Sequence, residues 1–206
     1  MSAISAQDVM RLRKATGTGM MDAKRALEQA EGDIERAKEI LREQGLADAR
    51  KRAGRVAAQG TVGHYLHVQS GRPVIGAIVE LTSETDFVAK SEPFVEVAQD
   101  IAMHVAAARP RWVRRADVPD DAVERERQLI ARQARKEGKP EPVVDKIVEG
   151  RLQTFYEDYV LYEQPFINPA KFEGTVGEMV DQLVAKMGEN IGVRRFARLA
   201  VGEEDE

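Results

Sequence analysis

Two runs rich in β-branched residues interrupt a chain whose other apolar residues recur mostly at helical intervals. The runs are residues 61–68 and 74–81, and a short turn over residues 69–73 joins them. Such a pair most economically forms a β-hairpin. Residues 191–201 alternate like a further strand, which we expect to join the hairpin in one sheet. One side of this strand carries Ile191, Val193, Ala197 and Leu199. The chain is therefore predicted to be α+β, with a small antiparallel sheet packed with helices.

The N-terminal residues predict three short helices. Ser5 is placed to cap the first, and Gly17 is placed to end it. The second is expected over residues 20–30, and the third begins at Ile34 and closes at Gly45. The second helix is expected to bury Met20, Ala23 and Leu27. An apolar stripe of Val9 and Leu12 marks the first helix, and Ile34, Ala37, Ile40 and Leu41 mark the third. Three helices of this length form a compact bundle that suits a docking surface better than an enzyme.

Four more helical patterns follow the second strand. The first begins near Ser91 and stops before Pro110. Residues 120–137 and 143–159 form the next two, and the glycine and prolines between them break the helix. Two helices joined by a short polar link predict a helical hairpin. A last helix is expected over residues 175–188, opened by a capping box and ended by glycine.

Composition restricts the class of protein. The chain has 206 residues, 32% of them charged, and a formal net charge of -4. A general nucleic-acid binder usually shows a basic surplus, so this charge counts against one. The absence of cysteine removes disulfides, thiolate nucleophiles and thiolate metal sites. We find neither a signal peptide nor an apolar run of membrane-spanning length, and we expect a cytoplasmic protein without membrane contact.

The connection between the second strand and the next helix is the segment to which we assign function. It spans residues 84–89 and carries Phe87 directly after the carboxylate of Asp86. A rigid strand–helix junction is a place where a protein can hold out a functional side chain. Two interpretations of Phe87 follow from the residues alone. The more common arrangement is that the ring packs under its own loop. The more specific interpretation is that the ring binds in a pocket of a partner protein.

Other segments that suggest chemistry have simpler explanations. Residues 16–20, Thr-Gly-Thr-Gly-Met, follow no predicted strand and lack phosphate-loop spacing, so they are interpreted as a link between helices. His64 and His67 point to opposite faces of a predicted strand, which disfavours a metal site. Trp112 is a lone aromatic residue in a basic loop, so packing is favoured over base stacking. We predict no cofactor and no catalytic residue.

Four segments resemble the bacterial elongation factor Ts family in its compact form. They are residues 12–45, 80–94, 156–167 and 186–198. The second segment contains the family's Thr-Asp-Phe-Val motif without a gap, as Thr85, Asp86, Phe87 and Val88. Ala23 stands where many members carry cysteine, and Thr82-Ser83 replaces an Asn-Cys pair. We expect neither departure to alter the packing or the turn.

The resemblance implies a translation factor that exchanges guanine nucleotides, not an enzyme. Its partner would be the GTPase elongation factor Tu, and residues 85–88 would enter it near the Mg²⁺ and phosphate site, releasing GDP. On this basis Phe87 is expected to protrude. A ubiquitin-associated-like N-terminal module would also dock on the partner. The residues assigned to this docking are Leu12, Thr18, Gly19, Met20 and Met21. The compact form further implies a homodimer.

The predicted organisation has four parts. They are a docking module (1–45), a basic linker helix (46–59), an α+β core and dimerisation domain (60–201) and an acidic tail (202–206). Two other hypotheses stay open. One is a nucleic-acid or ribosome-binding structural protein that uses the basic stretches 50–55 and 109–115. The other is a ubiquitin-type docking module fused to a scaffold.

Overall fold

The computed structural model describes residues 4–52 and 54–203. The α+β prediction is confirmed, with eight α-helices and a three-stranded sheet in this part of the chain. Contacts divide the chain into two compact units, each built from separate stretches of sequence. The first unit comprises residues 1–61, 81–95 and 180–192, and the second comprises 62–80, 96–179 and 193–206. Across the described residues, no helix is both long and apolar enough to cross a membrane.

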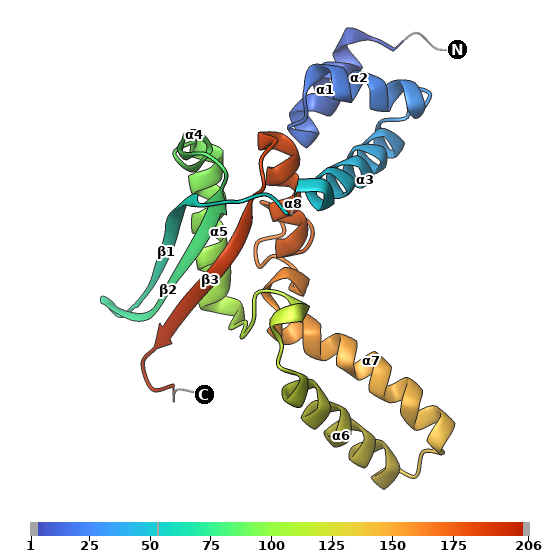
Figure 1. Cartoon of the computed structure of the whole chain (residues 1–206), viewed down its shortest axis with the longest axis vertical. Helices are drawn as coiled ribbons and strands as arrows, with labels where there is room; N and C mark the ends of the chain where they lie inside the picture. The colour runs from blue at the N-terminus through green and yellow to red at the C-terminus, as the bar shows by residue number, and fades with distance from the viewer. Residues whose placement is uncertain (1–3, 53, 204–206) are drawn as a thin grey trace. The chain divides into compact units, whose positions relative to one another are not determined.

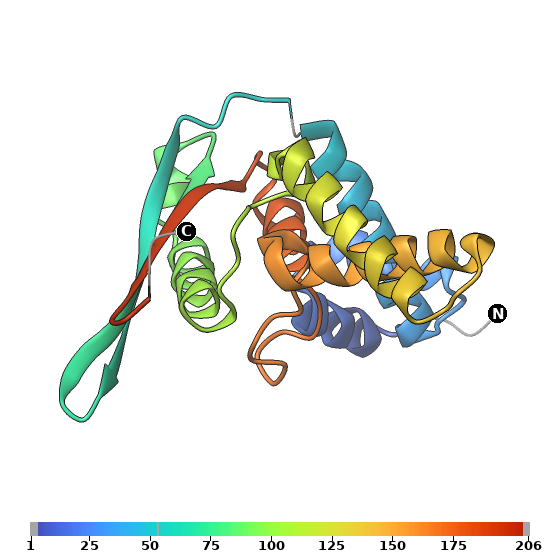
Figure 2. The ribbon, with the colours of Figure 1, turned by 90° about the horizontal axis from the view of Figure 1, so that it is seen from below.

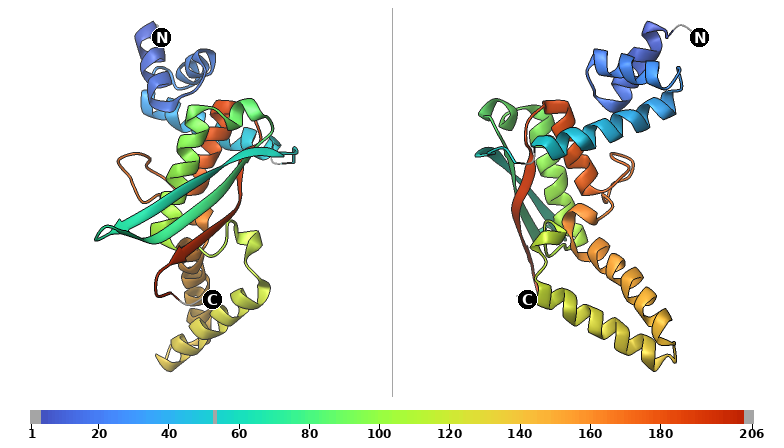
Figure 3. Two further views of the ribbon diagram at one scale, coloured as in Figure 1. Left: turned by 90° about the vertical axis from the view of Figure 1, so that its left-hand side faces the viewer. Right: turned by 45° about the vertical axis from the view of Figure 1, so that its right-hand side comes forward.

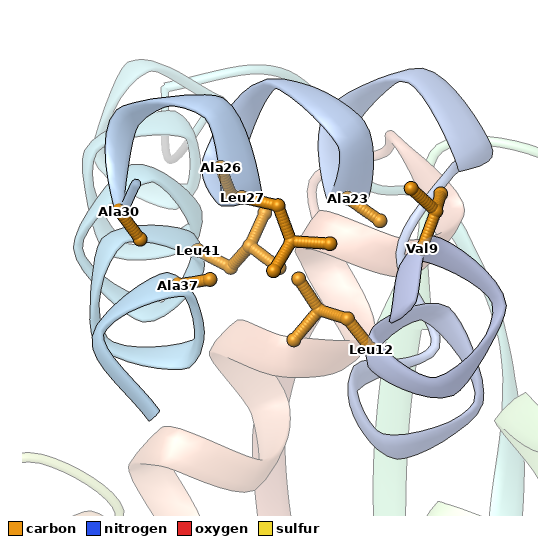
Figure 4. Close-up of a cluster of buried hydrophobic side chains, with 8 residues drawn as sticks. All are labelled: Val9, Leu12, Ala23, Ala26, Leu27, Ala30, Ala37 and Leu41. Carbon is orange, nitrogen blue, oxygen red and sulfur yellow. The ribbon is translucent and has the colours of Figure 1, made fainter. Parts of the chain in front are cut away.

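Three helices form the N-terminal part of the first unit (Figure 1). They are α1 (Ala6–Thr16), α2 (Met20–Gln29) and α3 (Ile34–Arg52). The predicted cap is confirmed, because the side chain of Ser5 accepts a hydrogen bond from the Asp8 amide at 3.1 Å. Gly17 ends α1 in a left-handed conformation, also as predicted. The core between these helices (Figure 4) consists of Val9, Leu12, Ala23, Ala26, Leu27, Ala30, Ala37 and Leu41.

Two predictions for these helices are wrong. Met20 is 44% exposed because it opens α2 and lies outside the core. The third helix does not close at Gly45 but continues to Arg52. Gly45 does not adopt the left-handed conformation with which a glycine ends a helix, and a Cβ there would make only an ordinary contact, 3.4 Å from the Cβ of Ala185. The linker predicted over residues 46–59 is therefore helical only in its first part, and residue 53 lies outside the described residues.

The predicted hairpin is confirmed, and the last strand joins it in one sheet (Figure 2). The strands are β1 (Gln59–Gln69), β2 (Arg72–Ser83) and β3 (Gly192–Ala200), with β2 in the centre. Ser70 and Gly71 form the hairpin turn, with φ values of 52° and 79°. Positive φ at both positions is what a type I′ turn requires. Val201, after β3, donates to the carbonyl of Val74, near the start of β2, at 2.9 Å, which fits antiparallel pairing.

The alternation predicted along β3 holds only in its first part. Ile191 and Val193 are buried, whereas Leu199 is 74% exposed. Arg198 uses the inner side of the strand at this end, because its Nε donates to the carbonyl of Ala106 at 2.9 Å. Successive side chains of a strand point to opposite faces, so Leu199 points outward.

One face of the sheet is covered by α5 (Glu92–Ala108), as Figure 2 shows. Phe94, Ile101 and Val105 of this helix are buried. A Cβ at Gly63 of β1 would lie 2.1 Å from the carbonyl oxygen of Ala98. No side chain fits within that distance, so α5 can approach β1 this closely only because residue 63 is glycine.

The predicted helical hairpin is formed by α6 (Asp120–Lys136) and α7 (Glu141–Tyr159), shown in Figure 3. Its seam is the buried cluster Ile130, Ala134, Val144, Val148 and Leu152. Short 3₁₀ helices, η1 (Arg115–Asp117) and η2 (Leu161–Glu163), precede and follow it. Trp112 packs on Phe155 with ring centroids 6.0 Å apart, which confirms its interpretation as a packing residue.

The last helix, α8 (Val176–Met187), opens with the predicted capping box. The Glu178 amide donates to Thr175 Oγ1 at 3.2 Å, and the Thr175 amide donates to the Glu178 carboxylate at 2.9 Å. Gly188, with a φ of 74°, ends the helix as predicted. In the acidic tail, Glu203 pairs with Arg109 at 3.2 Å, and residues 204–206 lie outside the described residues.

His104 is buried in the second unit and is hydrogen-bonded through both ring nitrogens. The amide of Ile167 donates to Nδ1 at 3.2 Å, and Nε2 lies 2.9 Å from the side-chain oxygen of Gln164. Because Nδ1 accepts, Nε2 carries the proton and donates. The amide group of Gln164 donates in turn to the carbonyl of Asp158 at 2.7 Å. Burial lowers the pKa of His104, so the neutral ring is the form that this network holds.

Replacing Gly63 with Ala should lower the free energy of unfolding by about 1–3 kcal/mol or more, because the added methyl group overlaps the backbone of α5. Gly150→Ala in α7 is the matched control. A Cβ at that position meets nothing within 4 Å, and Ala is favoured over Gly in a helix by about 1 kcal/mol. Urea denaturation should therefore shift in opposite directions for the two variants. Equal stability of Gly63→Ala and the unaltered chain would contradict the close approach.

Stability should fall as the pH drops below about 6.5, the ordinary pKa of histidine. In that range the unfolded chain binds a proton that the buried ring of His104 resists, so acid favours unfolding. Urea denaturation at a series of pH values measures this dependence. His104→Gln should flatten it, whereas His64→Gln, at an exposed position, should leave it in place. An unchanged pH dependence in His104→Gln would show that this imidazole has no part in it.

Candidate functional site

The connection between β2 and α5 is a tight turn that includes α4 (Asp86–Ala89), within the first unit. Thr85 caps this short helix, since its Oγ1 accepts a hydrogen bond from the Val88 amide at 3.4 Å. The buried hydroxyl of Ser83 donates to the carbonyl of Thr85 at 3.0 Å. The hydroxyl of Ser91 donates to the carbonyl of Val88 at 2.8 Å. Both ends of the turn are therefore held by hydrogen bonds from side chains to backbone.

Phe87 lies on the outer side of this turn and is 84% exposed. Ala89, two residues later, is buried and anchors the other side of α4. The ring therefore protrudes, and the interpretation in which it packs under its own loop is wrong. An exposed ring forgoes the roughly 1.5–3 kcal/mol that burial of such a side chain provides. The exposed ring has few contacts with its own chain that could hold it in place. Its position must therefore be set by the backbone of the turn.

Asp86 places a negative charge beside the ring. The ammonium of Lys90 donates to its carboxylate at 2.6 Å, one helical turn away. This hydrogen bond lowers the pKa of Asp86, so its carboxylate stays ionised at neutral pH. The turn thus presents an apolar ring and an anion together.

A carboxylate from a distant part of the sequence holds the start of the turn. Glu189, in the segment between α8 and β3, accepts hydrogen bonds through Oε2 from the amides of Glu84 and Thr85, both at 3.1 Å. Its Oε1 accepts from the hydroxyl of Thr85 at 2.6 Å. Three donors thus converge on one carboxylate, and hydrogen bonds to an ionised acceptor are stronger than those between neutral groups.

A second carboxylate, that of Glu84, joins the same two segments in the opposite direction. Glu84, in the turn, accepts from the backbone amide of Asn190 at 2.6 Å and lies 3.4 Å from the guanidinium of Arg55. The side-chain amide of Asn190 donates to the carbonyl of Arg55 at 2.6 Å. Each segment therefore places a carboxylate on backbone amides of the other. We call Glu84, Glu189 and Asn190 the turn clamp.

The sequence predicted the exposed residues of the site but missed those that hold them. Thr85, Asp86, Phe87 and Val88 do share one turn, as their adjacency requires. Glu189 lies 104 residues after Thr85. Its only local signal is its place directly after Gly188, where a polar side chain often bonds to backbone. That signal does not identify the backbone to which it bonds.

The residues assigned to N-terminal docking occupy two different environments. Thr18 and Gly19 lie in the connection between α1 and α2, and Met20 and Met21 begin α2, where Met21 is 63% exposed. Leu12 is fully buried in the core of the three helices. It can therefore support a docking surface from beneath but cannot contact a partner directly.

The histidines that the sequence analysis considered as metal ligands do not converge. His64 and His67 are both exposed on β1. Among the described residues, no three or more His, Asp or Glu side chains gather in a way that could hold a metal. The turn at residues 85–88 itself presents one aromatic ring, one anion and a backbone held by hydrogen bonds.

Comparison with known proteins identifies the family. A family model described as "Elongation factor TS" matches residues 23–173. The elongation factor Ts of Carboxydothermus hydrogenoformans is 53% identical over 201 residues, which cover 97% of this chain and 90% of that protein. The one from Alkaliphilus oremlandii is 50% identical over 200 residues, with coverage of 97% and 90%. The one from Thermosipho melanesiensis is 48% identical over 200 residues, with coverage of 97% and 100%.

These matches extend over nearly the whole chain, with both the N-terminal helices and the turn at residues 85–88 inside the aligned length. Identity near 50% over such a length is far above what shared fold alone produces. The chain belongs to the elongation factor Ts family, whose members are nucleotide-exchange factors of protein biosynthesis and not enzymes.

Proposed function

We propose that this chain binds the GTPase elongation factor Tu in its GDP form and promotes GDP release, so that GTP can load. In this proposal residues 85–88 insert next to the partner's Mg²⁺ and phosphate site. The observation that carries it is the exposure of Phe87, at 84%, on a turn fixed by hydrogen bonds. Nucleotide exchange breaks no covalent bond, so the chain needs a binding surface and no catalytic group.

The energy required is within reach of one aromatic side chain. Truncation of an aromatic anchor at an interface costs about 2–4 kcal/mol. Every 1.4 kcal/mol or so corresponds to a tenfold change in rate. Phe87 can therefore account for roughly a 30- to 1,000-fold acceleration, provided that its contact forms only as the nucleotide leaves. Linkage makes the effect mutual, because the factor and GDP weaken each other's binding equally.

Asp86 gives the insertion an electrostatic part. Its carboxylate is kept ionised by Lys90 and travels into the partner with the ring. We propose that it disturbs the ligands or the hydration of the partner's Mg²⁺, while Phe87 shifts the backbone around the phosphates. Loss of the cation leaves the phosphate charges unneutralised and lowers the affinity for nucleotide.

The N-terminal helices are proposed to dock on the partner's nucleotide domain. The exposed connection at residues 18–21 offers Met20 and Met21, whose flexible side chains adapt to irregular surfaces. The sheet and the helix α5 that packs on it would grip another domain of the partner. This arrangement keeps the predicted division into a docking module, a linker, a core and a tail.

The rival nucleic-acid hypothesis finds little support in the basic loop. Arg111 lies over the ring of Tyr159 at 4.7 Å, and Arg115 lies over Tyr156 at 4.7 Å. Arg115 also pairs with Glu163 at 2.7 Å. These guanidinium groups are engaged within their own chain, so the loop is not a free row of cations that could follow a phosphate backbone.

We also propose a homodimer, as the family resemblance implies, formed through the outer face of the sheet. Gly63 faces α5, so the even-numbered residues of β1 point to the opposite side. Exposed apolar side chains gather on the sheet away from α5, each at least 52% exposed: Val62, Leu66, Val68, Ile78 and Leu199. An apolar patch of this kind marks an interaction surface, and a two-fold axis allows one patch to cover its own copy.

Phe87→Ala should slow the factor-stimulated release of GDP from elongation factor Tu by roughly 30- to 1,000-fold, since the variant loses the aromatic anchor. Stopped-flow fluorescence of a labelled GDP measures this rate. Because the ring is exposed, the free energy of unfolding should change by less than about 0.5 kcal/mol. Leu129→Ala, which removes a 42% exposed apolar side chain from α6, should release GDP at the unaltered rate. Equal rates for Phe87→Ala and the unaltered factor would reject the insertion mechanism.

Leu66→Glu and Leu199→Glu should each convert the dimer to a monomer, because a charge in the centre of an apolar interface must be desolvated. Sedimentation velocity gives the mass in solution. Leu129→Glu on α6 is the control and should sediment as the unaltered chain does. If the Leu66 and Leu199 variants remain dimeric, the interface lies elsewhere.

A further inference from the structure

We propose that Glu189 is a positioning residue for nucleotide exchange, because its carboxylate fixes the turn from which Phe87 protrudes. This inference rests on the proposed function and deepens it. It adds a residue that never meets the partner's nucleotide site but determines how the ring is presented. The residue belongs to the turn clamp, 104 residues further along the chain than Thr85.

Glu189 accepts hydrogen bonds from two backbone amides that pair with no helix or strand. β2 ends at Ser83 and α4 begins at Asp86, so Glu84 and Thr85 belong to neither a strand nor a helix. Backbone donors left unpaired are unfavourable, and they restrict the chain only when something accepts them. Oε2 of Glu189 accepts both amides at 3.1 Å, and this determines the direction in which the chain leaves the sheet.

The third hydrogen bond links the clamp to the helix that carries the ring. The hydroxyl of Thr85 donates to Oε1 of Glu189 at 2.6 Å and accepts from the Val88 amide at 3.4 Å. One hydroxyl thus connects the carboxylate to the first turn of α4, where Phe87 lies. A change at residue 189 therefore reaches the ring through a single intervening side chain.

The clamp matters because the alternative for Phe87 is burial. A phenyl ring gains free energy when it leaves water, so a loosened turn would let it fold back onto the chain. Only the fraction of molecules with the ring extended can insert it, and the apparent activity falls with that fraction. Glu84, which accepts from the Asn190 amide at 2.6 Å, holds the opposing segment in place at the same time.

Glu189→Gln is the sharpest single change. Gln keeps the length of the side chain but replaces one acceptor oxygen with an NH₂ group, which cannot accept from the amides or the hydroxyl. We expect it to slow stimulated GDP release about tenfold, the factor that corresponds to roughly 1.4 kcal/mol. Thr85→Val breaks the same clamp from the other side and should also slow release. Glu178→Gln removes a capping carboxylate at the far end of α8, and it should lower stability without slowing release.

Two readouts separate positioning from a general loss of stability. In the free protein, hydrogen exchange at the amides of Glu84 and Thr85 should be at least about tenfold faster in Glu189→Gln and unchanged in Glu178→Gln. The second readout is a double-mutant cycle with Phe87→Ala. If Glu189 acts through the ring, adding Glu189→Gln to Phe87→Ala should slow release no further.

The outcomes are distinct. If Glu189→Gln stimulates GDP release at the unaltered rate while Phe87→Ala stimulates it slowly, the positioning role is overturned. The insertion mechanism then remains. The positioning role is also overturned if Glu189→Gln slows GDP release equally in the unaltered factor and in Phe87→Ala. The carboxylate would then act independently of the ring. Normal release by Phe87→Ala would remove the insertion mechanism, and the positioning role with it.

Discussion

The side chain of Phe87 is exposed to solvent, so packing contacts of the ring cannot hold it in position. The hydrogen-bonded backbone of the turn must do so. The ring is 84% exposed, whereas Ala89 on the same short helix is buried. Two features hold this arrangement: hydrogen bonds from Ser83 and Ser91 within the turn, and the carboxylate of Glu189 from another segment. A fixed turn means that little conformational entropy is lost when the ring enters a partner.

The proposed exchange mechanism requires binding contacts and no covalent chemistry. An exchange factor must favour the nucleotide-free form of its partner, and it does so through contacts made only in that form. In the mechanism proposed above, the ring would compete for space in the partner while the carboxylate would compete with phosphate for the cation. The hydrogen bond from Lys90 lowers the pKa of Asp86, so the carboxylate is charged at neutral pH.

In the second unit, a close approach between the backbones of α5 and β1 determines how the helix packs on the sheet. Gly63 of β1 lies where any Cβ would meet the carbonyl of Ala98 at 2.1 Å, so α5 lies directly on the strand. Glycine has another role in the third helix. Gly45 was predicted to end it because glycine commonly follows a helix, but the helix continues and this glycine lacks the left-handed conformation of a helix end. Local propensity cannot distinguish these uses of glycine, because the neighbour that decides is distant in sequence.

Local pattern by itself determined most of the elements, since hydrophobic period, caps and turn residues act over a few positions. It fixed the three N-terminal helices, the hairpin of strands, the helical hairpin, the capping box at Thr175 and the adjacency of Asp86 and Phe87. It failed along the second part of β3, where the predicted alternation does not continue: Leu199 is 74% exposed, and Arg198 bonds to α5. Only the tertiary structure brings Glu189 to Thr85, because a hydrogen bond between residues so far apart leaves no mark in either local sequence.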